Sequence, residues 1–149
     1  MKKSDNNVVS LFEQTNQGVQ KAVLTDSMKM KRGGSLSSPI IAYETWGKLS
    51  KQKDNVVVIL TGLSASSHVA SHSNNSKPGW WEGIVGPDKA IDTNKFYVIC
   101  VNSLGSCFGS TGPASINQIT GEPFRLTFPE LTIDDMATAT KLLLDKLDI

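Results

Sequence analysis

The sequence has little charge imbalance, no long apolar run and no recognisable export signal. Its 15 Lys and Arg residues against 14 Asp and Glu residues give a formal net charge of +1, and no basic stripe indicates a nucleic-acid partner. No apolar run approaches the length that crosses a membrane. Residues 1–6 are basic, but no apolar segment follows them, so we expect no secretion signal and a cytoplasmic protein.

Cysteine and histidine are scarce, with 2 of each. Cys100 and Cys107 could form one disulfide, but without an export signal we expect free thiols. His68 and His72 have the i, i+4 spacing of metal ligands on a helix, yet the sequence has no HExxH motif and no evident third ligand. We therefore expect no metal, and we interpret His68 as a hydrogen-bonding residue of a loop.

The sequence contains enough apolar residues to form the hydrophobic core of one domain. The chain has 149 residues, of which 39% are hydrophobic. Residues 1–19 are polar and rich in Asn and Gln, so we expect a flexible N-terminus there and a folded domain over 20–149. Within that domain, residues 21–30 and 38–46 read as strands, and Gly33-Gly34 between them predicts an antiparallel hairpin.

The central stretch is the apolar run 56–60, which stops in the small polar residues 61–67. An unbroken β-branched run is typical of a strand buried on both faces. The apolar strand 95–102 likewise ends in the small-residue segment 103–113. If the two strands are parallel neighbours, both loops lie on the side where such sheets bind ligands. A core strand followed by an ordinary turn is the alternative interpretation.

Two further features complete the expected architecture. The polar loop 64–77 is followed by Trp80 and Trp81, whose large apolar area predicts that part of the loop folds back on the body. A helix is predicted over 132–147, with Thr132 as its cap and acidic residues in its first turn. Its apolar stripe recurs at spacings of three and four, at Met136, Ala139, Leu143 and Leu147.

Two candidate nucleophiles lie in patterns close to G-x-S-x-G. Ser64 lies in the segment 62–66, but both histidines follow it immediately and none comes later. Cys107 lies in 105–109, but the next residues, 110–113, cannot begin the helix that a nucleophile elbow requires. The pair Asp134 and Asp135 is better explained by helix capping than by acid–base chemistry. The residues alone therefore predict ligand-side loops without a complete catalytic set.

Several long motifs resemble the homoserine O-acetyltransferase family of the α/β-hydrolase superfamily. They are PGWWE at 78–82, GPDKAIDT at 86–93, NSLGSC at 102–107, GSTGPASIN at 109–117 and FPELTIDD at 128–135. The TGLS stretch at 61–64, together with NSLGSC, is most similar to the serine O-succinyltransferase branch, since the acetyltransferase loop reads more like HALTG. The resemblance runs from about residue 20 to the end of the sequence.

The resemblance implies the N-terminal part of an α/β-hydrolase fold over 20–149: an antiparallel hairpin, two parallel strands and a helix. It also implies that the nucleophile elbow and the catalytic Ser, Asp and His come after Ile149, so that none is expected in this chain. The family position that gives an oxyanion-hole N–H matches Leu63. Gly62, Leu63, Ser64, Ala65 and Ser66 would then line the acyl site and help select the substrate.

The family's reaction passes an acyl group from coenzyme A to an enzyme serine and then to an amino-acid hydroxyl. The resemblance thus implies acetyl-CoA or succinyl-CoA as donor and L-serine or L-homoserine as acceptor, and it suggests a homodimer for the complete enzyme. We expect this chain to be inactive alone, as an N-terminal fragment of such an O-acyltransferase. The alternative is a non-enzymatic module that binds a partner or acyl-CoA. The sequence leaves the donor and the acceptor open.

Overall fold

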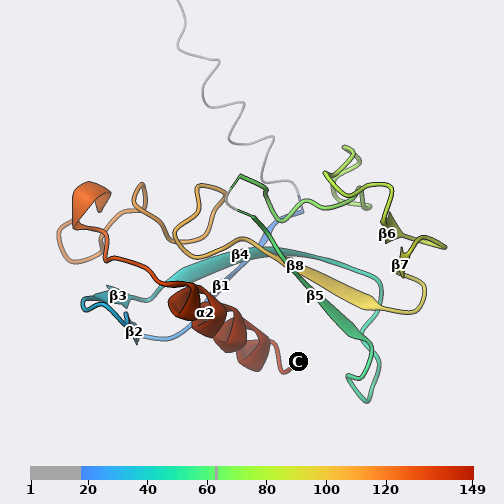
Figure 1. The fold of residues 1–149 in the computed structure, drawn as a ribbon, viewed down its shortest axis with the longest axis horizontal. Helices are drawn as coiled ribbons and strands as arrows, with labels where there is room; N and C mark the ends of the chain where they lie inside the picture. The colour runs from blue at the N-terminus through green and yellow to red at the C-terminus, as the bar shows by residue number, and fades with distance from the viewer. Residues whose placement is uncertain (1–17, 63) are drawn as a thin grey trace, which may run out of the picture.

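A computed structural model describes residues 18–62 and 64–149, so most of the predicted flexible N-terminus, 1–19, lies outside the described residues. Its centre is a 4-stranded sheet in the order β1-β4-β8-β5 (Figure 1). The strands are β1 (Gln20–Val23), β4 (Ile40–Trp46), β8 (Tyr97–Val101) and β5 (Val56–Leu60). β4 runs antiparallel to β1 and β8, whereas β5 is parallel to β8. This mixed sheet with one helix agrees with the predicted partial α/β fold.

The predicted hairpin is present, but its first arm is divided. β1 pairs antiparallel with β4, from Gln20 opposite Tyr43 to Val23 opposite Ile40. The chain then leaves the sheet, and β2 (Ser27–Lys29) pairs with β3 (Ser35–Ser37) as a separate 2-stranded ribbon. The prediction of one strand over 21–30 was therefore wrong. The glycine turn joins β2 to β3, where Met30 donates its N–H to the Gly34 carbonyl at 3.1 Å.

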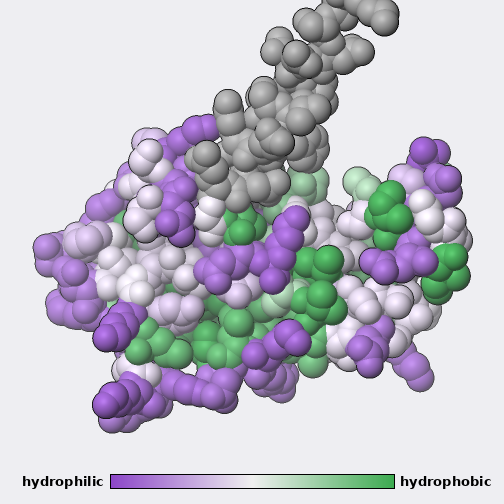
Figure 2. Space-filling model, turned by 180° about the vertical axis from the view of Figure 1, so that it is seen from behind, coloured by the Kyte–Doolittle hydropathy of each residue, from purple (hydrophilic) through white to green (hydrophobic). Residues whose placement is uncertain are grey.

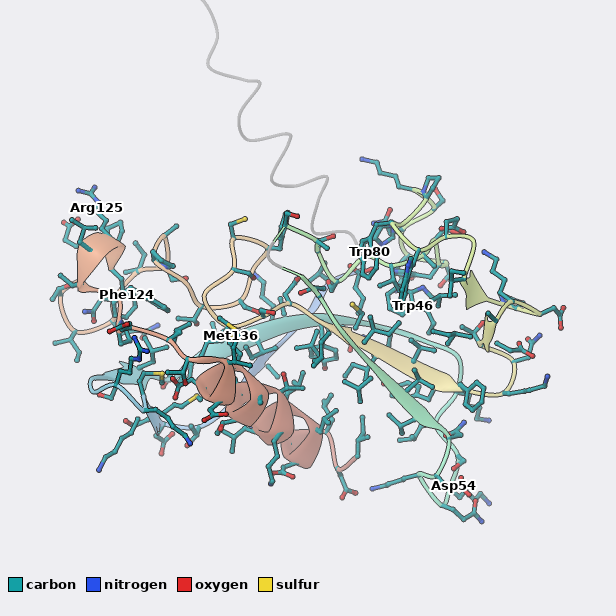
Figure 3. All side chains as sticks on the ribbon, viewed as in Figure 1. Trp46, Asp54, Trp80, Phe124, Arg125 and Met136 are labelled. Atoms are coloured by element: carbon teal, nitrogen blue, oxygen red, sulfur yellow. The ribbon has the colours of Figure 1, made fainter. Side chains whose placement is uncertain are left out.

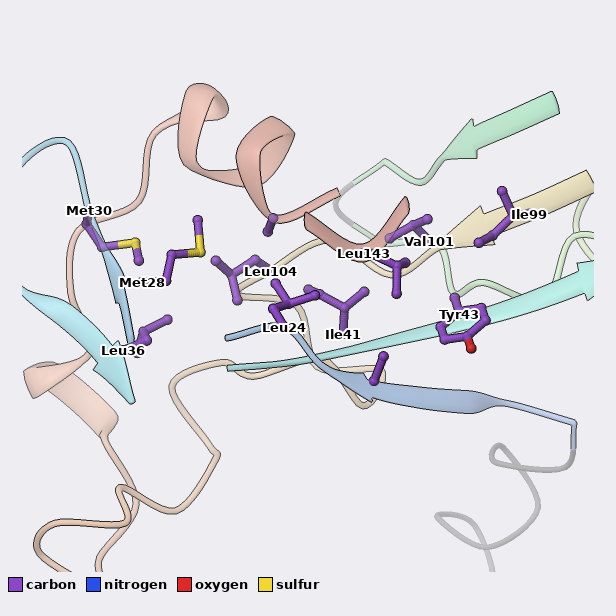
Figure 4. Packing of buried hydrophobic residues seen from close by; sticks show 12 residues of the cluster. Leu24, Met28, Met30, Leu36, Ile41, Tyr43, Ile99, Val101, Leu104 and Leu143 are labelled. Carbon is purple, nitrogen blue, oxygen red and sulfur yellow. The ribbon is translucent and has the colours of Figure 1, made fainter. Parts of the chain in front are cut away.

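Strand β8 is the buried centre of the sheet. Its residues alternate between two apolar clusters: Ile99 and Val101 pack on one face, Val98 and Cys100 on the other. All four are at most 2% exposed. The first cluster lies between the sheet, the β2–β3 ribbon and the helix (Figure 4). A continuous apolar run here does mark a strand that is covered on both faces.

Strand β5 has the predicted bounds but not the predicted burial. Only Ile59 is buried, while Val58 is 38% and Leu60 63% exposed. The reason is position, because β5 is an edge of the described sheet and has β8 as its one strand neighbour there. The expectation that the run is buried on both faces is corrected for this strand. Apolar side chains also reach the surface among polar ones when the molecule is seen from behind (Figure 2).

The C-terminal helix forms as its sequence predicts. α2 (Ile133–Lys146) begins after Thr132, whose hydroxyl accepts the Asp135 N–H, and the Asp135 carboxylate accepts the Thr132 N–H in return. Ala139 and Leu143 are 1% and 0% exposed and face the sheet. None of the helices in the described part of the chain is long and apolar enough to cross a membrane.

The connection from β5 to β8 is long and mostly irregular. Its described residues form the two-residue strands β6 (Val85–Gly86) and β7 (Ile91–Asp92), and the segment after β8 adds the 3₁₀ helix η1 (Arg125–Thr127). The tryptophan loop does fold back, since Trp81 donates its N–H to the Val69 carbonyl at 2.8 Å. A Cβ at Gly79 would overlap the backbone of Val69 and Ala70, so only glycine allows this approach.

Candidate functional site

The two small-residue loops meet at one edge of the sheet, as the sequence predicts. β5 and β8 are parallel and in register, with Leu60 opposite Val101, so their carboxyl ends lie side by side. The Thr61 hydroxyl donates to the Val101 carbonyl at 3.2 Å, and the Ser103 hydroxyl donates to the Thr61 carbonyl at 3.5 Å. The starts of the two loops are thereby joined.

Most of the predicted specificity residues, Gly62 to Ser66, can be placed in this loop. Ser64 is exposed, whereas Ala65 and Ser66 are half-buried. Ser66 is held twice: its hydroxyl accepts the His68 N–H at 3.3 Å, and its carbonyl accepts the Trp80 indole N–H at 2.8 Å. Leu63 lies outside the described residues, so its predicted oxyanion role stays a prediction.

A cavity of about 280 Å³ lies beside these loops. Its walls come from the ends of both strands, from the segment before α2 and from the first turn of α2. The lining residues are Gly62, Ser103, Leu104, Gly105, Ser106, Pro113, Phe128, Pro129, Leu131 and Met136. Met136 marks the α2 side of this region in Figure 3. The Ser106 hydroxyl oxygen is buried without a hydrogen-bond partner, so the wall retains one unsatisfied polar group.

A buried polar cluster lies beneath the loop that follows β5. Glu44 of β4 is 1% exposed, and its carboxylate faces three side chains of that loop. His68 Nδ1 and His72 Nε2 each lie 2.9 Å from Oε2, and the Ser67 hydroxyl donates to Oε1 at 3.1 Å. His68 is thus a hydrogen-bonding residue of the loop. His68 and His72 lie in irregular chain rather than on a helix.

The structure supplies the third group that the sequence analysis did not find near the two histidines. One ligand atom each from Glu44, His68 and His72 lies within 4.8 Å of the others, close enough to share a cation. However, His72 Nδ1 accepts the Asn74 N–H at 3.3 Å, so in the neutral ring the proton is on Nε2. His72 then donates to Glu44 and has no lone pair directed at a metal. The hydrogen bonds therefore favour a polar network over a metal centre.

The network continues to the end of β8 through Asn102, which is 1% exposed. Its side-chain N–H groups donate to the Ser67 hydroxyl at 3.2 Å and to the Phe108 carbonyl at 2.8 Å. The sequence analysis missed Glu44, Ser67 and Asn102. The available signal was a polar side chain within or directly after an apolar strand, since most buried polar groups have hydrogen-bond partners. Asn102 Oδ1 is an exception, because it is buried without a partner.

The cysteines are both free, and Cys100 is buried whereas Cys107 is exposed. Burial, together with the negative charge of Glu44, raises the pKa of the Cys100 thiol to about 12. Among the described residues, the side-chain hydrogen bonds of His68 and His72 go to neither Ser64 nor Cys107. The geometry thus activates neither candidate nucleophile.

The acidic pair at the start of α2 is structural, as predicted. The Asp135 carboxylate accepts the Lys31 N–H at 3.0 Å as well as the Thr132 N–H at 2.8 Å. Burial acts to raise the pKa of Asp135. The hydrogen bond from the Thr132 hydroxyl, followed by the two N–H bonds, outweighs burial and holds the pKa below its usual value. Asp134 forms an exposed ion pair with Lys31 at 3.0 Å. Asp134 and Asp135 therefore begin the helix and attach it to the turn after β2.

Curated relatives cover most of this chain. The serine O-succinyltransferase of Frateuria aurantia is 58% identical over 127 residues, which are 85% of this chain and 35% of the relative. The L-serine/homoserine O-acetyltransferase of Streptomyces lavendulae is 58% identical over 116 residues, 78% of this chain and 31% of the relative. Over this part of its length the chain is therefore similar to serine and homoserine O-acyltransferases. It spans about a third of the length of these relatives. No family model matches the chain.

Solved structures give a consistent result for the fold of this chain. The homoserine O-acetyltransferase of Bacillus anthracis matches with a TM-score of 0.80 and 33% identity, over 88% of this chain and 37% of that one. Esterase E22 matches with a TM-score of 0.78 and 38% identity, over 88% of this chain and 38% of that one. These neighbours are α/β-hydrolase enzymes. The predicted α/β-hydrolase resemblance is confirmed.

Proposed function

We propose that this chain forms part of an O-acyltransferase that moves an acetyl or succinyl group from acyl-CoA to the hydroxyl of L-serine or L-homoserine. The observation that carries the proposal is the 58% identity with relatives of both donor types over about four fifths of the chain. The reaction would proceed through an acyl-enzyme in two half-reactions, each with a tetrahedral oxyanion. Both substrates are small molecules, and we propose the cytoplasm as the location.

In this proposal the chain contributes the first strand-end loop. The Leu63 N–H would stabilise the oxyanion, while Gly62, Ser64, Ala65 and Ser66 would shape the pocket for the acyl group or the amino acid. The catalytic serine, aspartate and histidine would come from outside these 149 residues. Supporting this, the hydrogen bonds of His68 and His72 leave neither in contact with a candidate nucleophile.

A complementation assay tests the proposal. The downstream reading frame is searched for a GGSMGG-like elbow, and the polypeptide that it encodes is purified and mixed with this chain. Coenzyme A thiol release is measured with acetyl-CoA or succinyl-CoA and with L-serine or L-homoserine. We expect release from the mixture with at least one donor–acceptor pair, and none from either polypeptide alone.

Two outcomes would contradict the proposal. If no such frame exists, or the mixture is inactive with every pair, the O-acyltransferase proposal fails. Binding of acyl-CoA by the chain alone, measured by calorimetry, would in that case support the alternative of a non-enzymatic binding module.

A further inference from the structure

The Glu44 carboxylate is the point at which three parts of the molecule meet. It extends from the middle of β4, and it receives side chains from the loop after β5 at both of its oxygens. Through Ser67 it is joined to Asn102 at the end of β8, and Asn102 in turn holds the Phe108 carbonyl of the second loop. One buried carboxylate therefore connects both strand-end loops to the sheet.

Counting donors and acceptors assigns the protons of this cluster. His68 Nε2 lies 2.7 Å from the Lys77 carbonyl, which only accepts, so Nε2 carries a hydrogen. His68 Nδ1 lies 2.9 Å from Glu44 Oε2 and 3.5 Å from the Asn75 amide nitrogen, and the shorter contact places one shared proton between Nδ1 and Oε2. His72 already donates its Nε2–H to the same oxygen.

The shared proton can be on the carboxyl group or on the imidazole. Imidazole is intrinsically the stronger base of the two. The carboxylate form is also favoured by the hydrogen bonds that it accepts from Ser67 and His72. Among the described residues, the Cys100 thiol of β8, the strand partner of Glu44, is also titratable and is neutral. The assignment is thus an anion at Glu44, a cation at His68 and a neutral ring at His72.

We propose that Glu44 is a positioning residue, whose carboxylate, paired with an imidazolium at His68, fixes the loop after β5 against the end of β8. A buried ion pair of this kind adds little net stability. Each charge is nevertheless costly to bury without the other, so conformations that separate the two are disfavoured. The pairing therefore selects one arrangement of Ser66, Ser67 and His68. The value of this arrangement for acyl transfer rests on the proposed function, whereas the charge pairing does not.

The experiment is nitrogen-15 NMR of the histidine rings in the full 149-residue chain at neutral pH. We expect both ring nitrogens of His68 to be protonated and His72 to be the neutral Nε2–H tautomer. A neutral His68 ring, or a His72 ring protonated at Nδ1, overturns the assignment. Neither readout involves activity, so failure of the O-acyltransferase proposal and failure of this one are distinguishable.

The variant Glu44→Gln tests the positioning role. An amide cannot balance an imidazolium, so His68 should become neutral, and amide exchange at Ser66–His68 should accelerate about tenfold or more, as expected when a bond to a charged group is lost. Glu122→Gln, at an exposed glutamate, is the matched control and should change neither signal. Unchanged exchange in a folded Glu44→Gln protein, or a retained His68 imidazolium, overturns the proposal.

A second variant covers the case in which Glu44→Gln does not fold. Ser67→Ala leaves the Glu44–His68 pair intact but removes the link to Asn102. We expect the imidazolium signal of His68 to persist while amide exchange rises at Ser66–His68, with Ser76→Ala, at an exposed serine of the same loop, as control. If Ser67→Ala and Ser76→Ala give the same exchange rates, the carboxylate does not hold the loop.

Discussion

The Thr61 hydroxyl donates a hydrogen bond to the Val101 carbonyl at 3.2 Å, so the residue that follows β5 is fixed to the last residue of β8. Thr61 is only 9% exposed, and the parallel register has already placed the two strand ends side by side. This one bond fixes the start of the first strand-end loop. Later in the loop, Ser67 donates to the Glu44 carboxylate and the Ser66 carbonyl accepts the Trp80 indole N–H.

Thr61→Val should therefore lower the free energy of unfolding by about 1 kcal/mol, because it removes one buried hydrogen bond and leaves a carbonyl without that partner. Urea denaturation checks the value. Thr138→Val is the matched control, since Thr138 also donates to a backbone carbonyl, that of Asp134 at 2.7 Å, but is exposed. Equal effects of the two substitutions would contradict the importance of the Thr61 bond.

The open edge of β5 should make the isolated chain self-associate. Val58 and Leu60 are exposed on a strand whose outer backbone groups have no strand neighbour in the described sheet. Leu60→Lys should reduce association in light scattering, because a lysine on an edge strand opposes pairing. Ile133→Lys, at a residue that is 79% exposed on α2, should have little effect. A wild-type chain that elutes as a monomer and unfolds cooperatively would contradict this prediction.

Acid should loosen the loop that carries the tryptophans. The Glu82 carboxylate accepts the N–H groups of Gly79 at 3.0 Å and of Ser71 at 2.7 Å. These hydrogen bonds, the Gly79 bond most strongly, hold the pKa of Glu82 down at about 2. Because this pKa is below the unfolded value of about 4.3, the contribution to stability is complete above pH 4.3 and is lost as the pH falls toward 2.

The measurement is the unfolding free energy of wild type and of Glu82→Gln across that pH range. The wild type should be the more stable protein at neutral pH, and the difference should shrink as the pH falls. A difference that stays constant from neutral pH to pH 2 would show that the Glu82 hydrogen bonds do not stabilise the loop.

The purified chain should have no acyltransferase activity of its own. His68 and His72 are both hydrogen-bonded to Glu44, and no histidine follows His72 in the sequence. Thiol release from acetyl-CoA or succinyl-CoA, with L-serine or L-homoserine, should equal that of a boiled control. Release above the control that disappears in Ser64→Ala or Cys107→Ala would show that one of these residues does chemistry.

In the complemented enzyme, residues 63 and 64 should behave differently. Leu63→Pro removes the proposed oxyanion donor and should lower turnover about a hundredfold or more. Ser64→Ala removes a pocket contact and should leave turnover within about tenfold while shifting substrate preference. Complete loss of activity in a folded Ser64→Ala protein, with every substrate, would show that Ser64 takes part in the chemistry.

Local features of this chain could be predicted from the sequence because their causes are local. Thr132 and Asp135 form the predicted cap within one helical turn, and the apolar run 56–60 gives the strand bounds without error. The burial of that run could not be predicted, since it depends on which strand lies beside β5. The same pattern in β8 is buried because β4 and β5 lie on either side of it.

The contacts within the polar cluster around Glu44 could not be predicted from the sequence. Glu44 and His68 are 24 residues apart in the chain, and only the pairing of β4 with β8 and of β8 with β5 brings them together. The division of the first hairpin arm has a similar origin. Ser38 donates its N–H to the Asp26 carbonyl at 2.9 Å, a bond between the two arms that no local pattern predicts.

The contrast between the two cysteines makes the chain suitable for single-site labelling. Thiol reagents react with the thiolate, and a pKa of about 12 keeps Cys100 protonated and unreactive inside the sheet. Cys107 is exposed in the second strand-end loop. A maleimide fluorophore would therefore attach there without any engineered residue, and its emission would report when substrate or a second polypeptide reaches this edge of the sheet.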